Sequence, residues 1–366
     1  MKKIISIVGA RPNFMKIAPV HNAFKPFAEH YRHIICHTGQ HFDLNMSKVF
    51  FDELNIPEPG IHLGVSGGSH AVQTSRIMIE FEKVCLAERP DLVIVVGDVN
   101  STLACTLVAK KLCIPVAHIE AGLRSFDRTM PEEINRIVTD SISDYLFVTE
   151  KSGMDNLLNE GIPAGSIFFC GNVMIDCLIN LAPRIKESTI LSKLNLIPQK
   201  YVLVTFHRPS NVDNAEYLAT FFEFLNNIAK IRTVVFPIHP RTRKNLSESG
   251  LNLELSPAVV LLEPLGYLDF QALTSHAELI ITDSGGIQEE STFLGVPCIT
   301  IRENTERPVT VEVGTNQMAG TDLDVAYDLA QNIFNGLVRK GKIPDLWDGK
   351  ASERIVDQIM KLIPDN

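Results

Sequence analysis

The sequence predicts an α/β protein built from two Rossmann-like, doubly wound domains. Short runs rich in Val and Ile alternate with longer helical patterns along the whole chain. These runs lack a strict apolar–polar alternation, which is typical of parallel strands that are buried on both faces of a sheet. The chain also has 366 residues, more than one hydrophobic core usually fills. The pattern and the length together favour two doubly wound domains.

In the first half, each expected strand is a short apolar run bounded by polar or turn residues. We expect strands at Ile4–Val8, His33–His37, Leu92–Val96, Val116–Ile119, Tyr145–Val148 and Ile167–Cys170. Helical periodicity covers Met15–Phe27, Ala71–Glu88 and Ser101–Leu112. A further helix is expected to begin at Pro131, because Pro is favoured at the first helical position and two glutamates place negative charge in the first turn.

The second half repeats this alternation after a crossover that we expect between Gly171 and about Pro183. The expected strands are Tyr201–Phe206, Thr233–Ile238, Val259–Leu262, Leu279–Thr282 and Val296–Ile301. The expected helices are Ala215–Ile231, Tyr267–Ser275, Gln288–Leu294 and a last helix at Ser352–Ile363.

Charge and composition exclude several classes of partner. The net charge of −9 leaves no basic footprint for nucleic acid, so an anionic ligand has to meet a local cluster of cations. The apolar run Ile4–Ala10 is about as short as the core of a signal peptide can be, and Arg11-Pro12 follows at once, so we interpret it as a first buried strand. No run approaches the ~20 apolar residues of a membrane span.

Cysteine and histidine usage argues against metal and disulfide frameworks. The seven cysteines are scattered without a C-x-x-C pair, which favours free buried thiols in a reducing compartment and hence a cytoplasmic protein. The histidines show no metal-ligand spacing. We therefore expect neither a metal nor a disulfide.

A dense group of charged residues between two expected elements is the strongest candidate for chemistry. It follows the strand Val116–Ile119 and runs into the helix that begins at Pro131, and its members are Glu120, Arg124, Asp127, Arg128, Glu132 and Arg136. Asp98 ends the preceding strand. Because open α/β sheets bind ligands beyond the carboxyl ends of their strands, Asp98 is expected to face the same crevice.

Two glycine-containing helix starts are candidates for phosphate binding. After the first strand, Gly9 allows a sharp turn into a helix, with Arg11 and Lys16 as cations near its start. The segment is not G-x-G-x-x-G, so a nicotinamide cofactor is disfavoured.

The second helix start follows the strand Leu279–Thr282. Ser284 is expected to cap the helix, Gly285 and Gly286 allow close approach of phosphates, and Glu290 is placed to bind two ribose hydroxyls. His207 and His239 also end strands and are followed by arginines, which favours contact with an anion.

These motifs jointly resemble those of the non-hydrolysing UDP-N-acetylglucosamine 2-epimerases. The resemblance runs from residue 4 to about 320 and rests on Gly-Ala-Arg-Pro at 9–12, His-Thr-Gly-Gln-His-Phe-Asp at 37–43, Gly97-Asp98, His118-Ile119-Glu120-Ala121-Gly122-Leu123-Arg124, Pro131-Glu132-Glu133-Ile134-Asn135-Arg136, Ser284-Gly285-Gly286-Ile287-Gln288-Glu289-Glu290 and Thr305-Glu306-Arg307-Pro308.

The resemblance implies the GT-B architecture, with a nucleotide-sugar in the cleft between two Rossmann-like domains, and a homodimer. It implies an N-terminal domain of residues 1–172, completed by a C-terminal helix at about 352–366, that carries the catalytic carboxylates. Residues 173–351 are then the UDP-binding domain. The expected partners are a UDP-sugar and a second copy of the chain, without a cofactor, and the expected pathway is cell-surface polysaccharide biosynthesis.

The resemblance also implies roles for individual residues. Asp98, Glu120 and Glu132 are implied as catalytic acids and bases, with His207 by the leaving phosphate. The residues implied around the diphosphate and nearby groups are Arg11, Lys16, Ser284, Gly285, Gly286 and Arg307. Glu290 is implied for the ribose, and Phe270 with the backbone near Leu265 for the uracil. Arg136 and His239 are further candidates for substrate contact, from their positions in the charged group and at a strand end.

Some features leave the exact substrate and regulation open. Many relatives have Glu where this chain has Asn13, and His-Arg-x-Glu-Asn where it has His207-Arg208-Pro209-Ser210-Asn211. Some relatives bind a second UDP-GlcNAc as an activator beside a pair of the Gln40-His41 type, but Ser66–Arg76 departs from their pattern. The loop Ser125–Arg128 is similar to that of relatives acting on UDP-2,3-diacetamido-uronic acids.

The expected reaction is a reversible epimerisation at C2 of UDP-GlcNAc, giving UDP-ManNAc. The C2 proton is not acidic in the ground state, so the C1–O bond to UDP has to break first, after which a carboxylate removes the proton and leaves a glycal. Re-addition of UDP with a proton on the other face inverts C2. We expect the carboxylates to be tuned by mutual repulsion and burial. A C2 epimerase of a diacetamido-uronate, a GT-B glycosyltransferase, a hydrolysing epimerase and a non-catalytic sugar-nucleotide sensor are the alternatives.

Overall fold

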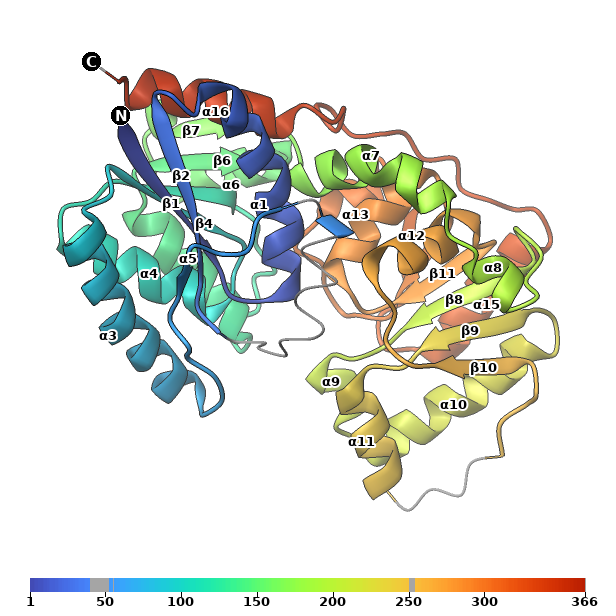
Figure 1. Cartoon of the computed structure of the whole chain (residues 1–366). Coiled ribbons are helices and arrows are strands. Elements are labelled where there is room, and N and C mark those ends of the chain that lie inside the picture. The colour runs from blue at the N-terminus through green and yellow to red at the C-terminus, as the bar shows by residue number, and fades with distance from the viewer. Residues whose placement is uncertain (40–52, 55, 250–253, 366) are drawn as a thin grey trace. The chain divides into compact units, whose positions relative to one another are not determined.

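The computed structural model describes residues 1–39, 53–54, 56–249 and 254–365. The chain divides into two compact units (Figure 1). The first comprises Met1–Asn180 and Asp345–Asn366, and the second comprises Leu181–Pro344. Each unit is an α/β domain with its own parallel sheet, as the sequence predicts.

Parallel strands form one sheet in the described part of the first unit, in the order β3-β2-β1-β4-β5-β6-β7. The strands are β1 (Lys2–Val8), β2 (Tyr31–His37), β3 (Ile61–His62), β4 (Leu92–Val96), β5 (Val116–Ala121), β6 (Tyr145–Val148) and β7 (Ile167–Phe169). The winding direction reverses between β1 and β4, which pair directly. The residues that follow β1 and β4 therefore flank the topological switch point, where doubly wound sheets bind ligands.

Helices cover the first sheet and anchor the C-terminus to it. They are α1 (Arg11–Phe24), η1 (Lys25–Phe27), α3 (His70–Glu88), α4 (Asn100–Lys111), α5 (Pro131–Ile142), α6 (Lys151–Asn159), η2 (Ala164–Ser166), α7 (Val173–Lys186), which continues into the second unit, and α16 (Ala351–Leu362). Helix α16 packs against α1 (Figure 1). The buried carboxylate of Asp176 accepts hydrogen bonds from the backbone N–H groups of Ala351 and Ser352, at 3.1 and 2.6 Å, and so holds the start of α16.

The second unit repeats this topology in its described residues, with the strand order β10-β9-β8-β11-β12-β13. Its strands are β8 (Tyr201–Thr205), β9 (Thr233–Pro237), β10 (Val259–Leu262), β11 (Leu279–Thr282), β12 (Cys298–Thr300) and β13 (Asn316–Met318). Its helices are α8 (Ile190–Lys193), α9 (Pro209–Val212), α10 (Ala215–Ala229), α11 (Pro240–Glu248), α12 (Tyr267–His276), α13 (Gly285–Leu294), α14 (Pro308–Glu312) and α15 (Leu323–Phe334). The switch point lies between β8 and β11, which pair in parallel.

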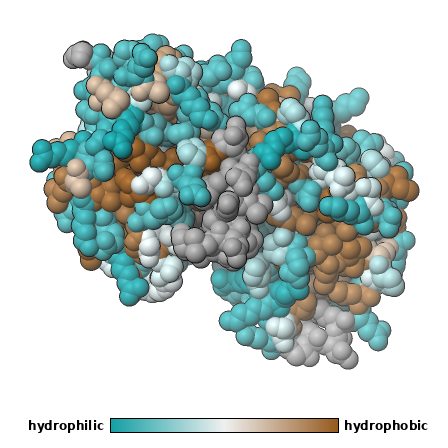
Figure 2. Space-filling view, in the orientation of Figure 1, coloured by the Kyte–Doolittle hydropathy of each residue, from teal (hydrophilic) through white to brown (hydrophobic). Residues whose placement is uncertain are grey.

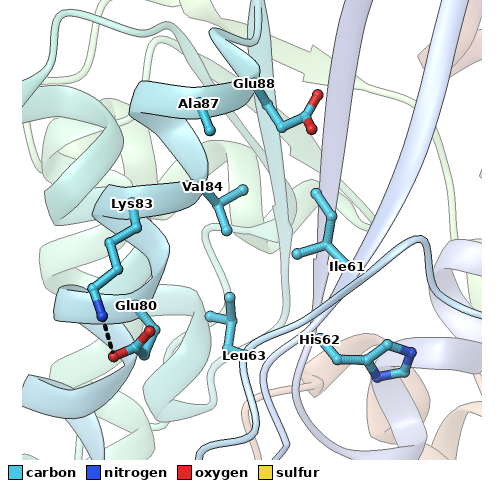
Figure 3. Close-up of a pocket in the computed structure, with 8 residues that line it drawn as sticks. All are labelled: Ile61, His62, Leu63, Glu80, Lys83, Val84, Ala87 and Glu88. Atoms are coloured by element: carbon cyan, nitrogen blue, oxygen red, sulfur yellow. Dashed lines mark hydrogen bonds and ion pairs between the residues drawn. The ribbon is translucent and has the colours of Figure 1, made fainter.

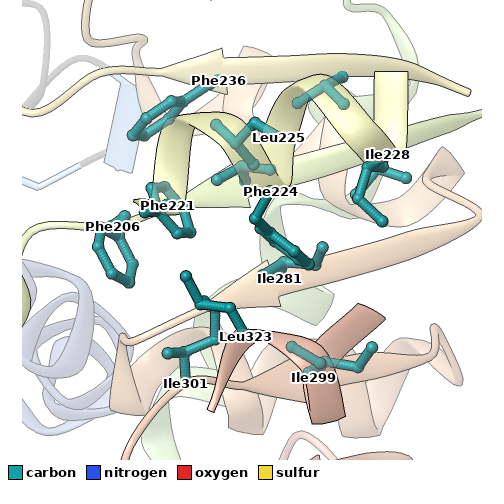
Figure 4. Packing of buried hydrophobic residues seen from close by; sticks show 14 of the residues in the cluster. Phe206, Phe221, Phe224, Leu225, Ile228, Phe236, Ile281, Ile299, Ile301 and Leu323 are labelled. Atoms are coloured by element: carbon teal, nitrogen blue, oxygen red, sulfur yellow. The ribbon is translucent and has the colours of Figure 1, made fainter. Parts of the chain in front are cut away.

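The core of the second unit is rich in phenylalanine. Phe221 on α10 stacks on Phe206, just beyond β8, with ring centroids 3.7 Å apart and planes 7° from parallel. Phe236 of β9 meets Phe221 edge to face (Figure 4). These contacts fix the end of β8, and so the position from which His207 leaves the sheet.

Most expected elements are confirmed, but the helices α6, α11 and α15 were not predicted, and the crossover expected after Gly171 is the helix α7. Other differences lie at short strands and helix starts. The predicted bounds of β4, β6, β10 and β11 agree with the structure. The short strands β3 and β13 were not predicted. Helices α1 and α13 begin at Arg11 and Gly285, earlier than their apolar periodicity indicates.

The character of the surface and the state of the cysteines are as the amino-acid composition leads us to expect. Hydrophilic side chains predominate on the face in Figure 2, and apolar ones gather in separate patches. Within the described residues, no helix is both long and apolar enough to cross a bilayer. All seven cysteines are free thiols; six are buried and Cys113 is exposed.

Candidate active site

Asn13 ties together the two strand ends at the switch point of the first unit. Its side-chain oxygen accepts hydrogen bonds from the backbone N–H groups of Gly9 and Ala10, at 3.1 and 2.9 Å. Its amide nitrogen donates to the carbonyl of Val96, the last residue of β4, at 3.1 Å. Arg11 is the first residue of α1, but its side chain lies outside the described part of the chain.

Lys16 and Glu120 form a buried ion pair at this point. Lys16 belongs to α1 and Glu120 to β5, and their side chains are only 9% and 5% exposed. A Cβ added at Gly97 would lie 3.2 Å from the Lys16 ammonium and 3.3 Å from the Glu120 carboxylate, so Gly97 lies against the pair. Lys16 is therefore a buried lysine and not a surface one.

Asp98 follows Gly97 and pairs with Arg136 of α5. The guanidinium of Arg136 also donates to Glu133, with Nε and Nη2 at 2.9 and 2.7 Å from the carboxylate. Asn135 donates to the backbone carbonyl of Asp98 at 2.8 Å. Helix α5 thus holds both the backbone and the side chain of Asp98.

The carboxylates of this site are balanced by cations. The sequence leads us to expect tuning by mutual repulsion and burial; the structure adds a cationic partner for two of them, Lys16 for Glu120 and Arg136 for Asp98. Glu132 is exposed and precedes Arg136 by one turn of α5. The structure thus brings Lys16, Asp98, Glu120 and Arg136 together and places Glu132 on the same helix as Arg136.

In the second unit, Asp283 organises the loop that carries His207. One carboxylate oxygen of Asp283 accepts the backbone N–H groups of His207 and Arg208, both at 2.8 Å. The other lies 3.1 Å from Nδ1 of His207. Burial acts to raise the pKa of Asp283, but the charge of His207 and these hydrogen bonds outweigh it and lower the pKa. The ring of His207 is 38% exposed.

His239 lies beside His207, with ring centroids 5.3 Å apart. His239 is the N-cap of α11, where its Nδ1 accepts the backbone N–H of Arg241 at 3.2 Å. A neutral imidazole that accepts at Nδ1 carries its proton at Nε2. The two histidines that the sequence singles out therefore share one end of the second sheet.

The glycine-containing start of α13 lies against a buried cluster of charge. A Cβ at Gly285 would come within 2.5 Å of Nη1 of Arg307 and 2.8 Å of Oε1 of Glu306, whereas a Cβ at Gly286 would meet nothing within 4 Å. Ser284 is the N-cap residue, but its side chain makes no capping hydrogen bond, so the expected cap is wrong. The backbone N–H of Ser284 instead donates to Thr282 Oγ1 at 2.9 Å.

Three arginines surround Glu306. Arg307 and Arg302 donate to its carboxylate at 2.5 and 2.6 Å, and Arg208 lies 3.6 Å away. Burial acts to raise the pKa of Glu306, but these three charges lower it well below its ordinary value. The sequence analysis names Arg307 but gives Glu306 no role, although the position of Glu306 between Arg302 and Arg307 in the sequence was a signal.

Glu290 is almost completely buried and faces α12. Tyr267 donates to its carboxylate at 3.3 Å, and Gln271 is a second hydrogen-bond partner. Phe270 lies between these two residues on α12, and Leu265 comes just before that helix; both are partly buried. Of the residues implied for ribose and uracil, Glu290 is on α13, Phe270 is on α12, and Leu265 lies just before α12.

A hollow elsewhere in the first unit contains none of the candidate residues. It has a volume of about 250 Å³ and lies between the edge strand β3 and α3 (Figure 3). Ile61, Leu63 and Val84 form its apolar wall, and Lys83 pairs with Glu80 at its side at 2.7 Å. His62 and Glu88 also line it, and none of its lining residues belongs to the candidate site.

The Gln40-His41 pair and Phe42-Asp43 lie outside the described residues. In the ranges that the structure describes, no group of three or more His, Cys, Asp or Glu side chains is arranged to hold a metal ion.

Known proteins match this chain over nearly its whole length. The model of the family described as UDP-N-acetylglucosamine 2-epimerase matches residues 27–360. A UDP-N-acetylglucosamine 2-epimerase of Methanocaldococcus jannaschii is 46% identical over 361 residues, which cover 97% of this chain and 98% of the relative. A UDP-2,3-diacetamido-2,3-dideoxy-D-glucuronate 2-epimerase of Pseudomonas aeruginosa is 42% identical over 98% of this chain and all of the relative.

The solved structures agree with this match. The crystal structure of the Methanocaldococcus jannaschii UDP-GlcNAc 2-epimerase in complex with UDP-GlcNAc and UDP superimposes with a TM-score of 0.91 at 44% identity. The match covers 98% of this chain and 99% of that one. The sequence match, the fold and the paired carboxylates at the switch point lead to one conclusion: this chain belongs to the UDP-N-acetylglucosamine 2-epimerase family.

Proposed function

We propose that the protein catalyses the reversible epimerisation of UDP-GlcNAc to UDP-ManNAc at C2, by elimination of UDP to a glycal and re-addition. The observation that carries this proposal is the pair of cation-bound carboxylates, Asp98 and Glu120, at the switch point of a chain that belongs to this family. The first unit supplies the acids and bases, and the second unit binds UDP.

The chemistry requires a charged leaving group and proton transfer at one carbon. As the C1–O bond breaks, negative charge develops on the diphosphate, and Arg307 with the N–H groups at the start of α13 stabilises it. His207 approaches the same oxygens, with its Nδ1 side held by Asp283. The positive character at C1 then makes the C2 proton acidic enough for a carboxylate to remove it.

Asp98, Glu120 and Glu132 act at the sugar. Two carboxylates on opposite faces of C2 are needed if the proton leaves from one face and returns to the other. Lys16 and Arg136 hold Glu120 and Asp98 in fixed orientations, which the near-attack geometry of proton transfer requires. Arg11, His239, Phe270 and Leu265 complete the proposed contacts to the nucleotide.

The proposed function is tested by NMR of the protein with UDP-GlcNAc in heavy water. We expect UDP-ManNAc to form without an acceptor or added nicotinamide, and both UDP-sugars to carry deuterium at C2. Release of free ManNAc would identify a hydrolysing enzyme, and conversion only with an acceptor would identify a glycosyltransferase. Retention of protium at C2 during epimerisation, or a requirement for NAD, would rule out the elimination route.

A second candidate substrate is a UDP-2,3-diacetamido-uronic acid, because the Pseudomonas aeruginosa relative named for that sugar is 42% identical. We favour UDP-GlcNAc, since the sequence offers no clear pair of arginines for the uronate carboxyl and Arg128 is a single cation. The same NMR experiment with the diacetamido-uronate decides between them. A higher kcat/KM for the uronate would reverse the choice.

The affinity for the substrate is expected to depend on pH through Glu290. Burial raises the pKa of its carboxyl to about 7; hydrogen bonds from Gln271 and Tyr267 oppose the shift and the charge of Glu289 adds to it. Only the ionised carboxylate accepts two ribose hydroxyls. Below this pKa the site first has to lose a proton, so affinity is expected to rise about tenfold per pH unit up to pH ~7 and then level off.

Calorimetry with UDP-GlcNAc measures this dependence, because its diphosphate does not titrate in this range. In Glu290→Gln the affinity should be lower and nearly independent of pH. A wild-type protein whose affinity is flat between pH 5.5 and 8 would contradict the assignment of Glu290 to the ribose.

We also propose that the protein is a homodimer and that α3 takes part in the interface. Val72, Ile79 and Leu86 recur every seven residues on α3, so they lie on one face, and they are 38%, 57% and 60% exposed. An exposed apolar row of this kind is suited to contact with a second copy. Sedimentation velocity is expected to give a dimer for the wild type and a weaker one for Ile79→Glu; an unchanged dimer would exclude α3.

The proposed location is the cytoplasm. Seven free thiols, six of them buried, suit a reducing compartment. Fractionation of cells that express the protein tests this, and recovery from an oxidising compartment would contradict it.

A further inference from the structure

Glu120 occupies a backbone conformation that a regular strand does not provide. Its φ is +73°, in the left-handed region that residues other than glycine rarely adopt. The pairing of β5 with β6 shifts at the same place: Ile119 pairs with Phe147 and Ala121 with Val148, so Glu120 is an extra residue. Glu120 is therefore the bulged residue of β5.

A β-bulge re-aims a side chain, and here it aims the carboxylate at Lys16. In a regular strand, successive side chains alternate between the two faces of the sheet. Loss of the bulge would change both the φ of Glu120 and the face to which its side chain points. Something must hold this residue in a conformation that its own backbone disfavours.

The carboxylate of Asp140 on α5 forms hydrogen bonds to residues on both sides of the bulge. One oxygen lies 2.6 Å from Nδ1 of His118, two residues before Glu120. The other accepts the backbone N–H of Gly122, two residues after it, at 3.0 Å, and Nη1 of Arg124 at 2.7 Å. Asp140 and His118 have no exposed surface, and Arg124 is 3% exposed.

The same contacts extend to the residue before Asp98. Nε2 of His118 lies 2.9 Å from the carbonyl oxygen of Gly97, which can only accept, so His118 donates there. The N–H of Gly97 donates to the carbonyl of Ile119 at 3.1 Å. Both polar groups of Gly97 are thus held by β5, and Asp98 follows directly. On its outer side, Arg124 is fixed by two bonds to Glu160, at 2.8 and 2.7 Å.

We infer that Asp140 is a positioning residue for the epimerase reaction: it clamps the bulge at Glu120 directly and, through His118, the Gly97-Asp98 turn. This inference rests on the proposed function. Asp140 lies behind the strand and touches His118, Gly122 and Arg124, so it acts through Glu120 and Asp98. Helix α5 then serves the site twice, with Arg136 on Asp98 and Asp140 one turn further along.

The test is Asp140→Asn with Asp144→Asn as its matched control. The amide of asparagine has nearly the same volume as the carboxylate, but its NH2 group replaces one of the two acceptor oxygens. This NH2 group would face either the N–H of Gly122 or Nδ1 of His118, so one of these two contacts is lost. Asp144 makes comparable bonds at the other end of β5, to the backbone N–H of Val116 at 2.8 Å and to Lys110. It lies outside the site, so Asp144→Asn should keep wild-type turnover.

For Asp140→Asn we expect kcat to fall by about 10²-fold, the scale of a small misplacement of a reacting group, with UDP affinity unchanged. Because Asp140 acts through Glu120 and Asp98, the substitution should cause a smaller further loss in a Glu120→Gln background, where only its effect on Asp98 remains. Damage to the fold would instead lower the activity of both backgrounds by the same factor. Wild-type turnover in Asp140→Asn, or a full additional loss in the double variant, would overturn the inference.

A crystal structure of Asp140→Asn gives a readout that needs no activity. We expect Glu120 to leave the left-handed region and its carboxylate to turn away from Lys16; an unchanged Glu120 would overturn the inference. If the wild type does not epimerise any UDP-sugar, the proposed function fails, and this structure still decides whether Asp140 sets Glu120. If Asp140→Asn does not fold, His118→Gln is the second variant. It removes the contact between Asp140 and His118 but keeps a donor for the carbonyl of Gly97, and we again expect Glu120 to leave the left-handed region.

Discussion

Replacing Glu120 by glutamine is expected to lower kcat for the epimerisation of UDP-GlcNAc by at least ~10²-fold, in the range typical of general acid–base catalysis. The amide fills the same space in the buried position beside Lys16. It cannot take or return a proton at C2, so deuterium incorporation should fall together with epimerisation. UDP affinity should change little, because Glu120 is proposed to face the sugar and not the nucleotide. Asp98→Asn and Glu132→Gln are expected to have effects of the same order.

Glu88→Gln provides a matched control for this substitution. Glu88 also pairs with a lysine, Lys3, at 2.8 Å, but the pair lies near the other end of β1. Its loss should leave kcat and UDP affinity at wild-type values. If Glu120→Gln retained substantial turnover, or if it abolished UDP binding, Glu120 would not act as an acid or base at the sugar.

The strands of this protein could be predicted because they are buried on both faces. The runs at β4, β6, β10 and β11 are continuous apolar segments, and their bounds follow from the sequence. The strands β3 and β13 have two and three residues, too few to form a periodic signal. The predicted start of α1 is too late. Its true start is stabilised by the side chain of Asn13, which accepts the backbone N–H groups of Gly9 and Ala10, and asparagine is an unusual residue for this capping position.

The candidate residues could be named from the sequence, but their pairing could not. Lys16 and Glu120 are 104 positions apart and meet only because β1, β4 and β5 are neighbours in the sheet. The bulge at Glu120 is likewise invisible in the sequence, since it depends on the register of β5 against β6 and on a carboxylate from α5. Residue types and their local spacing therefore indicate which side chains can act in catalysis. Which side chains form ion pairs with one another depends on strand order and register, which local sequence patterns do not reveal.

Gly286→Ala is expected to weaken UDP binding by at least about 10²-fold without destabilising the protein. A Cβ at Gly286 would meet nothing within 4 Å, so the methyl group has room, and alanine in a helix is favoured over glycine by roughly 0.5–1 kcal/mol. The melting temperature should therefore stay the same or rise. The open space is also where we propose that the diphosphate approaches the N–H groups of α13. Losing two charge-assisted hydrogen bonds there, at about 1.5–3 kcal/mol each, corresponds to affinity at least about 10²-fold weaker.

Gly285→Ala is the matched partner of this variant, one residue away in the same turn. Its Cβ would lie 2.5 Å from Arg307 and 2.8 Å from Glu306, both buried, so the charge cluster has to shift. We expect Gly285→Ala to lower the melting temperature as well as UDP affinity, because breaking a buried ion pair is costly, about 3–5 kcal/mol when one partner is lost outright. Calorimetric titration with UDP and thermal melting of both variants separate the two effects. A diphosphate in contact with the backbone at Gly286 would clash with the added methyl group. Tight UDP binding by Gly286→Ala would therefore show that the diphosphate does not approach this helix start.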